Sequence, residues 1–116
     1  MKDILICIDM QNDFIDGSLG TSEAVNIVNN VKNKIIEYDS AGTILSNEDE
    51  LGYSRIYFTR DTHISESSDY SPDSIPSYQN SLEGYHLPIK HCIYGTDGWE
   101  IRKSLTNAVI HNPLYI

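Results

Sequence analysis

Ile4-Leu5-Ile6-Cys7-Ile8, residues 4–8 of the chain, form a nearly continuous apolar run that stops at Asp9. Strands of a parallel sheet have this composition when helices cover both faces of the sheet. We therefore predict that residues 4–8 are an inner strand of an α/β domain. Asp9 is then expected just beyond the carboxyl end of this strand.

The next elements complete a βαβ unit. Residues 11–20 contain two glycines and several polar turn-formers, which predicts a loop. Helical spacing follows, from an N-cap at Thr21 or Ser22 to about Tyr38. Its apolar positions are Ala24, Val28, Val31 and Ile35. A second strand is expected at residues 55–59, and strand, helix and strand in this order give a right-handed crossover.

The rest of the chain is less regular. Residues 43–53 and 64–81 are polar excursions, and a structureless loop as long as the second is either functional or mobile. Asp97 and Glu100 have capping-box spacing, which predicts a short helix opening there. A third strand is expected at residues 108–110.

The composition of the chain limits the classes of function that it can have. With 116 residues, 40% of them apolar, the chain fits one globular domain. Its formal net charge of −9 disfavours binding to nucleic acid or to an anionic membrane surface. No apolar run approaches the ~20 residues of a membrane span. Two cysteines form no disulfide framework, so we expect a reducing, cytoplasmic location.

Acidic residues follow both expected strands. If the strands are parallel, Asp9 and Asp61 lie at the same edge of the sheet, where open α/β sheets bind their ligands. Each residue can also have a purely local role, Asp9 capping a turn and Asp61 starting the next loop. The pattern alone leaves both interpretations open.

Asp61 and His63 flank one residue, and His91 lies further along. One carboxylate and two imidazoles suit Zn²⁺, Fe²⁺ or Mn²⁺ with open positions for water and substrate. These residues can equally be ordinary surface or core residues, as we expect for His86 and His111.

Cys92 stands beside His91, which suggests a Cys–His nucleophilic pair. Adjacent residues usually point apart, however, and catalytic partners are normally distant in the chain. We therefore interpret Cys92 as a packed thiol.

Three segments, in this order, resemble the isochorismatase-like cysteine hydrolases, and the nicotinamidase branch in particular. They are residues 6–14 (ICIDMQNDF), 58–63 (FTRDTH) and 87–99 (LPIKHCIYGTDGW). The resemblance covers the chain apart from the two excursions. It implies a three-layer α/β/α, Rossmann-like parallel sheet, of which residues 1–116 would form a partial domain with about the first three strands.

The resemblance also implies roles for individual residues. Asp9 would be the general base beside the nucleophile, and Phe14 would line the pocket of a planar substrate. Asp61, His63 and His91 would bind the metal, which in nicotinamidases holds the ring nitrogen of the substrate. Isochorismatase-type members commonly lack this metal trio, so its presence favours an amidase acting on a small amide such as nicotinamide.

Two other groups of the family mechanism, a cysteine thiolate and a lysine, are expected to be absent. The family's cysteine lies on an element well beyond Ile116, and Asn112 stands where the lysine belongs. We therefore expect a truncated chain that is inactive alone. Its half-sheet would expose an apolar edge and face, which favours association, including homo-oligomers.

Three functions remain open on this basis. The chain specifies a nicotinamidase-like, metal-assisted amidase in truncated form. Alternatively, it is a non-catalytic pseudoenzyme that keeps a metal or ligand pocket. The third possibility is an interaction module whose sheet is completed by another copy or by a partner chain.

Overall fold

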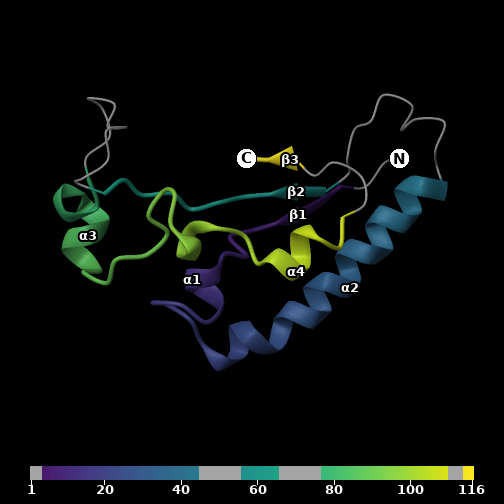
Figure 1. Ribbon diagram of the computed structural model, residues 1–116, viewed down its shortest axis with the longest axis horizontal. Coiled ribbons are helices and arrows are strands. Elements are labelled where there is room, and N and C mark those ends of the chain that lie inside the picture. Colours follow the sequence, from purple (N-terminus) through teal and green to yellow (C-terminus); the bar gives the residue numbers. More distant parts are fainter. Residues whose placement is uncertain (1–3, 45–55, 66–76, 110–113) are drawn as a thin grey trace.

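The computed structural model describes residues 4–44, 56–65, 77–109 and 114–116. Three short strands form a parallel sheet in the order β1 (Leu5–Cys7), β2 (Ile56–Phe58) and β3 (Leu114–Tyr115). In the register of the sheet, Ile6 pairs with Tyr57 and Phe58 pairs with Tyr115. In Figure 1, α1, α2 and α4 all lie below the strands. The predicted α/β class with a parallel sheet is confirmed.

Short helical turns connect the strands. They are α1 (Asn12–Ile15), α3 (Leu82–His86), α4 (Lys103–Thr106) and the 3-10 turns η2 (Tyr78–Asn80) and η3 (Asp97–Trp99). The prediction of a loop over residues 11–20 was therefore wrong at α1. Ile15 is buried there, so packing stabilises one helical turn within a polar sequence. The helix expected near Asp97 is the 3-10 turn η3, and its side-chain cap is not formed.

The long helix α2 (Ser22–Ile44) follows the predicted pattern at its start. Thr21 is the N-cap, because its hydroxyl accepts a hydrogen bond from the backbone N–H of Ala24 at 3.0 Å. Ile35 is fully buried, and Val28 and Val31 pack beside it against the core. The helix continues past the end predicted near Tyr38, since Asp39 is itself buried and that turn still packs on the domain.

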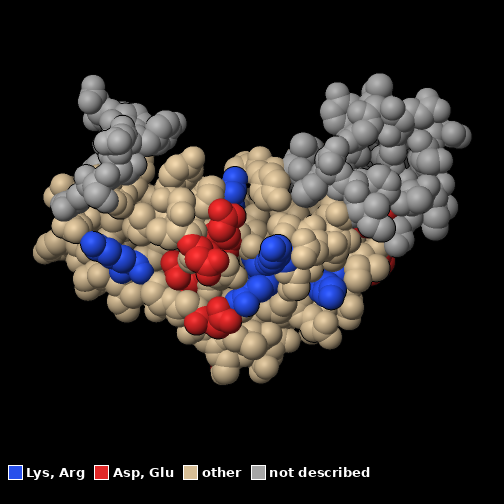
Figure 2. Space-filling view, in the orientation of Figure 1, with Lys and Arg blue, Asp and Glu red and all other residues tan. Residues whose placement is uncertain are grey.

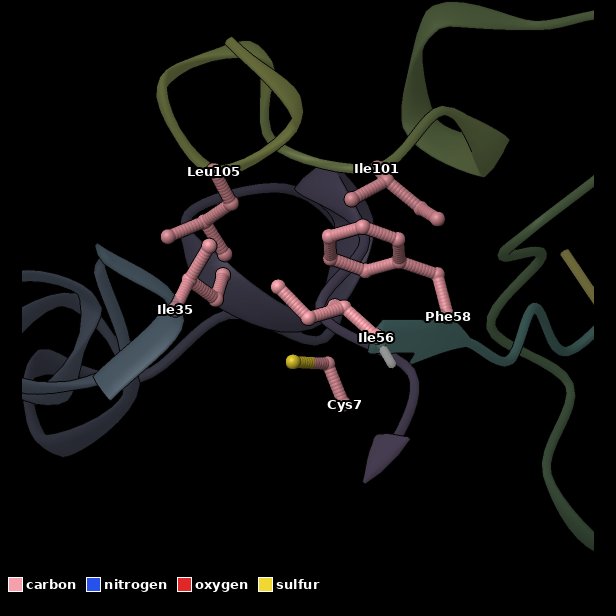
Figure 3. Close-up of a cluster of buried hydrophobic side chains, with 6 residues drawn as sticks. All are labelled: Cys7, Ile35, Ile56, Phe58, Ile101 and Leu105. Carbon is pink, nitrogen blue, oxygen red and sulfur yellow. The ribbon is translucent and has the colours of Figure 1, made fainter. Parts of the chain in front are cut away.

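One apolar cluster joins the sheet to the helices beneath it (Figure 3). Its fully or nearly fully buried members come from β1, α2, β2 and the segment around α4: Cys7, Ile35, Ile56, Phe58, Ile101 and Leu105. Burying a large aliphatic or aromatic side chain contributes about 1.5–3 kcal/mol. This cluster fixes β1 and β2 side by side, so the residues that follow both strands lie at one edge of the sheet.

The opposite face of the sheet is uncovered in the described part of the chain. Ile4, Ile6 and Ile8 alternate with the buried positions of β1 and are 55%, 47% and 69% exposed. Tyr57, which pairs with Ile6, is half-buried on the same face. The prediction that residues 4–8 are buried on both faces was therefore wrong, because the helices described here pack on one side only.

The third strand is also displaced from its predicted position. Ala108 lies in a turn and Val109 in no strand; both follow α4 and pack against the core. The third strand is Leu114–Tyr115 instead. Asn112 and His111 lie outside the described residues, as do residues 45–53 and 66–76 of the two excursions.

Within the described residues, the helices are too short or too polar to cross a bilayer. On the face shown in Figure 2, acidic side chains form a central group with basic side chains on either side. The described part of this face therefore carries mixed charge rather than the continuous basic stripe typical of phosphate-backbone binding.

Substitutions at two adjacent positions on α2 test the packing of the core. Ile35→Ala should lower the free energy of unfolding by about 2–5 kcal/mol, because it opens a cavity in a fully buried cluster. Ile36→Ala, at a position that is 44% exposed, is the matched control and should change it by about 0.5 kcal/mol or less. Urea unfolding measures both, and equal losses in the two variants would contradict the packing described here.

Candidate metal centre

The site lies at the carboxyl edge of the sheet, where Asp9 follows β1 and Asp61 follows β2. Because the two strands are parallel neighbours, both acids are delivered to the same edge, as the sequence predicted. Asp9 adopts a left-handed backbone conformation with φ of 52°. This conformation ends the strand and turns the chain along the edge.

Thr59 fixes Asp9 in place. The backbone N–H of Asp9 donates to Thr59 Oγ1 at 3.0 Å, and the Thr59 hydroxyl donates to Asp9 Oδ1 at 2.8 Å. One carboxylate oxygen of Asp9 is therefore held by the neighbouring strand. This pairing was not anticipated from the sequence, although Thr59 lies within one of the quoted segments.

Gln11 joins three segments of the site through a fully buried amide. Its nitrogen donates to the backbone carbonyls of Asp61 and Trp99, both at 2.8 Å. Its oxygen accepts the backbone N–H of Asp61, also at 2.8 Å. The backbone of Asp61 is thereby fixed on both its donor and its acceptor side.

The segments that carry the two histidines are paired along their backbones. His63 N–H donates to the Cys92 carbonyl at 2.9 Å, and Tyr94 N–H donates to the His63 carbonyl at 2.8 Å. This parallel bridge brings the rings of His63 and His91 to a centroid distance of 4.9 Å. Asp13 supports the same segment, because its Oδ2 accepts the Cys92 N–H at 2.8 Å.

Gly98 makes room for the Asp13 carboxylate. A Cβ atom at this position would lie 2.1 Å from Asp13 Oδ2. Any other residue would therefore displace the carboxylate that holds Cys92. This close approach explains why the middle position of η3 is a glycine.

Four side chains converge at the centre of this arrangement: Asp61, His63, Glu83 and His91. One ligand atom from each lies within 4.8 Å of the others. His63 Nε2 is 3.1 Å from Asp61 Oδ2 and 3.3 Å from a Glu83 oxygen. His91 Nε2 is 3.1 Å from the other Glu83 oxygen and 3.4 Å from Asp61 Oδ2. Glu83, from α3, was not predicted from the sequence.

The hydrogen bonding of His91 fits a cation at this centre. Its Nδ1 lies 2.9 Å from the Ile89 carbonyl, which can only accept, so Nδ1 carries a proton. In the neutral ring, Nε2 then presents a lone pair to the carboxylates of Asp61 and Glu83. Lone pairs facing lone pairs require a proton or a metal ion between them. His91 is 1% exposed, so bulk water does not fill this role.

The donor set fits a divalent metal in its chemistry as well. Two imidazole nitrogens and two carboxylate oxygens suit Zn²⁺, Fe²⁺ or Mn²⁺. The Phe14 ring borders the cluster, with its centroid 5.6 Å from that of His91. The residues expected to bind a metal and a planar substrate therefore lie side by side. His86 is exposed on α3 and is not part of the four-residue group.

Cys92 is fully buried. Burial, and then the nearby carboxylates led by Asp61, raise the pKa of the Cys92 thiol from 9.0 to about 12. Burial likewise raises the pKa of Cys7 to about 11. A thiol with so high a pKa is protonated at neutral pH and is a poor nucleophile. These values support the interpretation of Cys92 as a packed thiol.

No family model matches the sequence, and no curated protein matches it significantly. Among solved structures, N-carbamoylsarcosine amidase from Thermoplasma acidophilum matches with a TM-score of 0.58, at 21% identity over 99% of this chain. The zinc complex of pyrazinamidase from Pyrococcus horikoshii matches with a TM-score of 0.55, at 20% identity over the whole chain.

The nicotinamidase/pyrazinamidase from Bacillus subtilis matches with a TM-score of 0.52, at 25% identity over the whole chain. The chain has the isochorismatase-like fold. It spans about half the length of these solved chains, 50%, 51% and 55% respectively. The resemblance seen in the sequence, to the N-terminal portion of this fold, is confirmed.

The buried thiol of Cys92 makes stability depend on alkaline pH. Below about pH 9 both the folded and the unfolded thiol hold their proton. Between pH 9 and about 12 only the unfolded thiol loses it. The free energy of unfolding should therefore fall as pH rises, by about 1.4 kcal/mol per pH unit from this residue.

Urea unfolding at a series of pH values, with wild type and Cys92→Ser compared, measures this contribution. The variant lacks the titrating thiol and should lose stability less steeply above pH 9. Parallel curves for the two proteins would contradict the raised pKa.

Proposed function

We propose that this chain forms the metal- and substrate-binding half of a nicotinamidase-like amidase, which hydrolyses the C–N bond of a small amide. The observation that supports this most directly is the convergence of Asp61, His63 and His91 beside Phe14. The fold is the same as that of solved amidases. One of those relatives is described in complex with zinc.

Each residue has a role in this proposal. A bound divalent metal would hold and polarise a ring nitrogen of the substrate. Phe14 would pack on the planar ring beside His91. Asp9, with one carboxylate oxygen fixed by Thr59, would accept the proton of the attacking group.

The nucleophile is not among the described side chains. The sequence contains two cysteines, Cys7 and Cys92, and both are buried thiols with raised pKa values. The attacking thiolate would therefore come from a polypeptide segment outside this half of the fold. Binding of metal and substrate, in contrast, requires only residues present here.

Glu83 favours a second candidate function. With Glu83 the cluster offers four donors, which is the full set of a closed, structural zinc site. Catalytic sites keep one position open for water or substrate. In this alternative the chain is a non-catalytic pseudoenzyme, and the metal stabilises the segments that carry the ligands.

Metal content tests the site itself. The purified protein should contain near-stoichiometric zinc, iron or manganese by elemental analysis. His63→Ala and His91→Ala remove a ligand and should each weaken metal binding by about a hundredfold or more. His86→Ala, on the exposed side of α3, is the matched control and should bind metal as wild type does. Wild-type protein without affinity for any of these ions would contradict both candidate functions.

The visible spectrum of cobalt-loaded protein distinguishes the two candidates. In an amidase site, nicotinamide should reach the metal and change the spectrum of the wild-type protein. In a closed site, nicotinamide should change the spectrum only after Glu83→Ala opens a position. The response of the wild type therefore decides whether Glu83 leaves room for substrate.

A further inference from the structure

Tyr78 lies against the centre without being one of its four potential ligands. It is 3% exposed, and its ring meets His63 and His91 edge-on, at centroid distances of 5.1 and 5.4 Å. Tyr78 therefore forms one wall of the cluster. Its ring excludes water from the sides of both imidazoles.

The Tyr78 hydroxyl contacts the loop that leads to His91. It is hydrogen-bonded to the carbonyl of Leu87 and lies 2.9 Å from the carbonyl of Ile89. It is also 3.4 Å from His91 Nδ1. The Ile89 carbonyl is the group that accepts the Nδ1 proton of His91. Tyr78 thus fixes the acceptor that determines which nitrogen of His91 is protonated.

The Tyr78 backbone reaches the segments of the other ligands. Its N–H donates to the Ile64 carbonyl at 2.8 Å, next to His63. Its carbonyl accepts from the Ser81 hydroxyl at 2.6 Å, and Ser81 caps the helix that carries Glu83. At Gly84, a Cβ atom would lie 2.0 Å from the Tyr78 carbonyl oxygen, so α3 packs directly on this residue.

We propose that Tyr78 is a positioning residue of the metal centre, which holds His91 with Nδ1 protonated and Nε2 free for the metal. The inference rests on the proposed metal-binding function. Tyr78 belongs to the second polar excursion and lies outside the three segments that carry the family resemblance. A metal-binding imidazole usually donates its other N–H to such a fixed partner, and losing that partner weakens metal binding about 10- to 100-fold.

Tyr78→Phe tests the hydroxyl while keeping the ring. Zinc affinity, measured by competition with a chromophoric chelator, should fall about tenfold or more. The cobalt spectrum should also change, since the orientation of His91 is no longer fixed. Tyr85→Phe removes a hydroxyl from an 80% exposed residue on α3 and should change neither quantity. Wild-type zinc affinity and spectrum in Tyr78→Phe would overturn the inference.

A second measurement needs no variant. The ¹⁵N chemical shifts of the His91 imidazole in the zinc-loaded wild type should show a protonated Nδ1 and a metal-bound Nε2. Metal on Nδ1 would overturn the inference even if Tyr78→Phe failed to fold. Wild-type protein that binds no zinc would instead refute the proposed function on which the inference rests.

Discussion

The buried amide of Gln11 is the contact on which the site depends. It satisfies both backbone groups of Asp61 and also binds the carbonyl of Trp99, so it ties three distant segments at the sheet edge. Each of these hydrogen bonds contributes only about 1 kcal/mol, but leaving a buried partner unsatisfied costs about 1–3 kcal/mol. Without Gln11, the backbone N–H and carbonyl of Asp61 would both lose their side-chain hydrogen-bond partner.

A second set of hydrogen bonds positions the segments that carry the two histidines. The backbone bridge from His63 to Cys92 and Tyr94 aligns the two histidines, and Asp13 holds the same segment from α1. The ligands are therefore presented by hydrogen-bonded backbone rather than by the sheet alone. This explains how a small three-stranded sheet supports a convergent set of donors: the edge segments pair with one another beyond the ends of the strands.

The features of the molecule that depend on local sequence pattern could be predicted from the sequence. The apolar runs before Asp9 and Asp61 predicted two strands and a shared edge, and the N-cap candidates Thr21 and Ser22 predicted the start of α2. Glu83 was missed, because a carboxylate on a short polar helix becomes a potential ligand only through tertiary placement. The third strand was predicted at the wrong position, because the apolar residues Ala108 and Val109 pack against the core after α4 and do not pair in the sheet. The exposed face of β1 could not be predicted either, because the sequence pattern shows which residues are apolar but not which elements cover them.

The position of Glu83 has a consequence for the unfolded chain. Twenty positions of sequence separate it from His63, so a metal bound by both would act as a cross-link that closes a loop. The loop-entropy relation for covalent cross-links gives about 3 kcal/mol for a ring of this size. In the unfolded chain a metal held by both residues would have to meet this entropy cost, so it would bind the folded form more tightly and stabilise it by mass action. The ion would act as a removable cross-link of the folded domain, in a chain whose two thiols are both buried and unpaired.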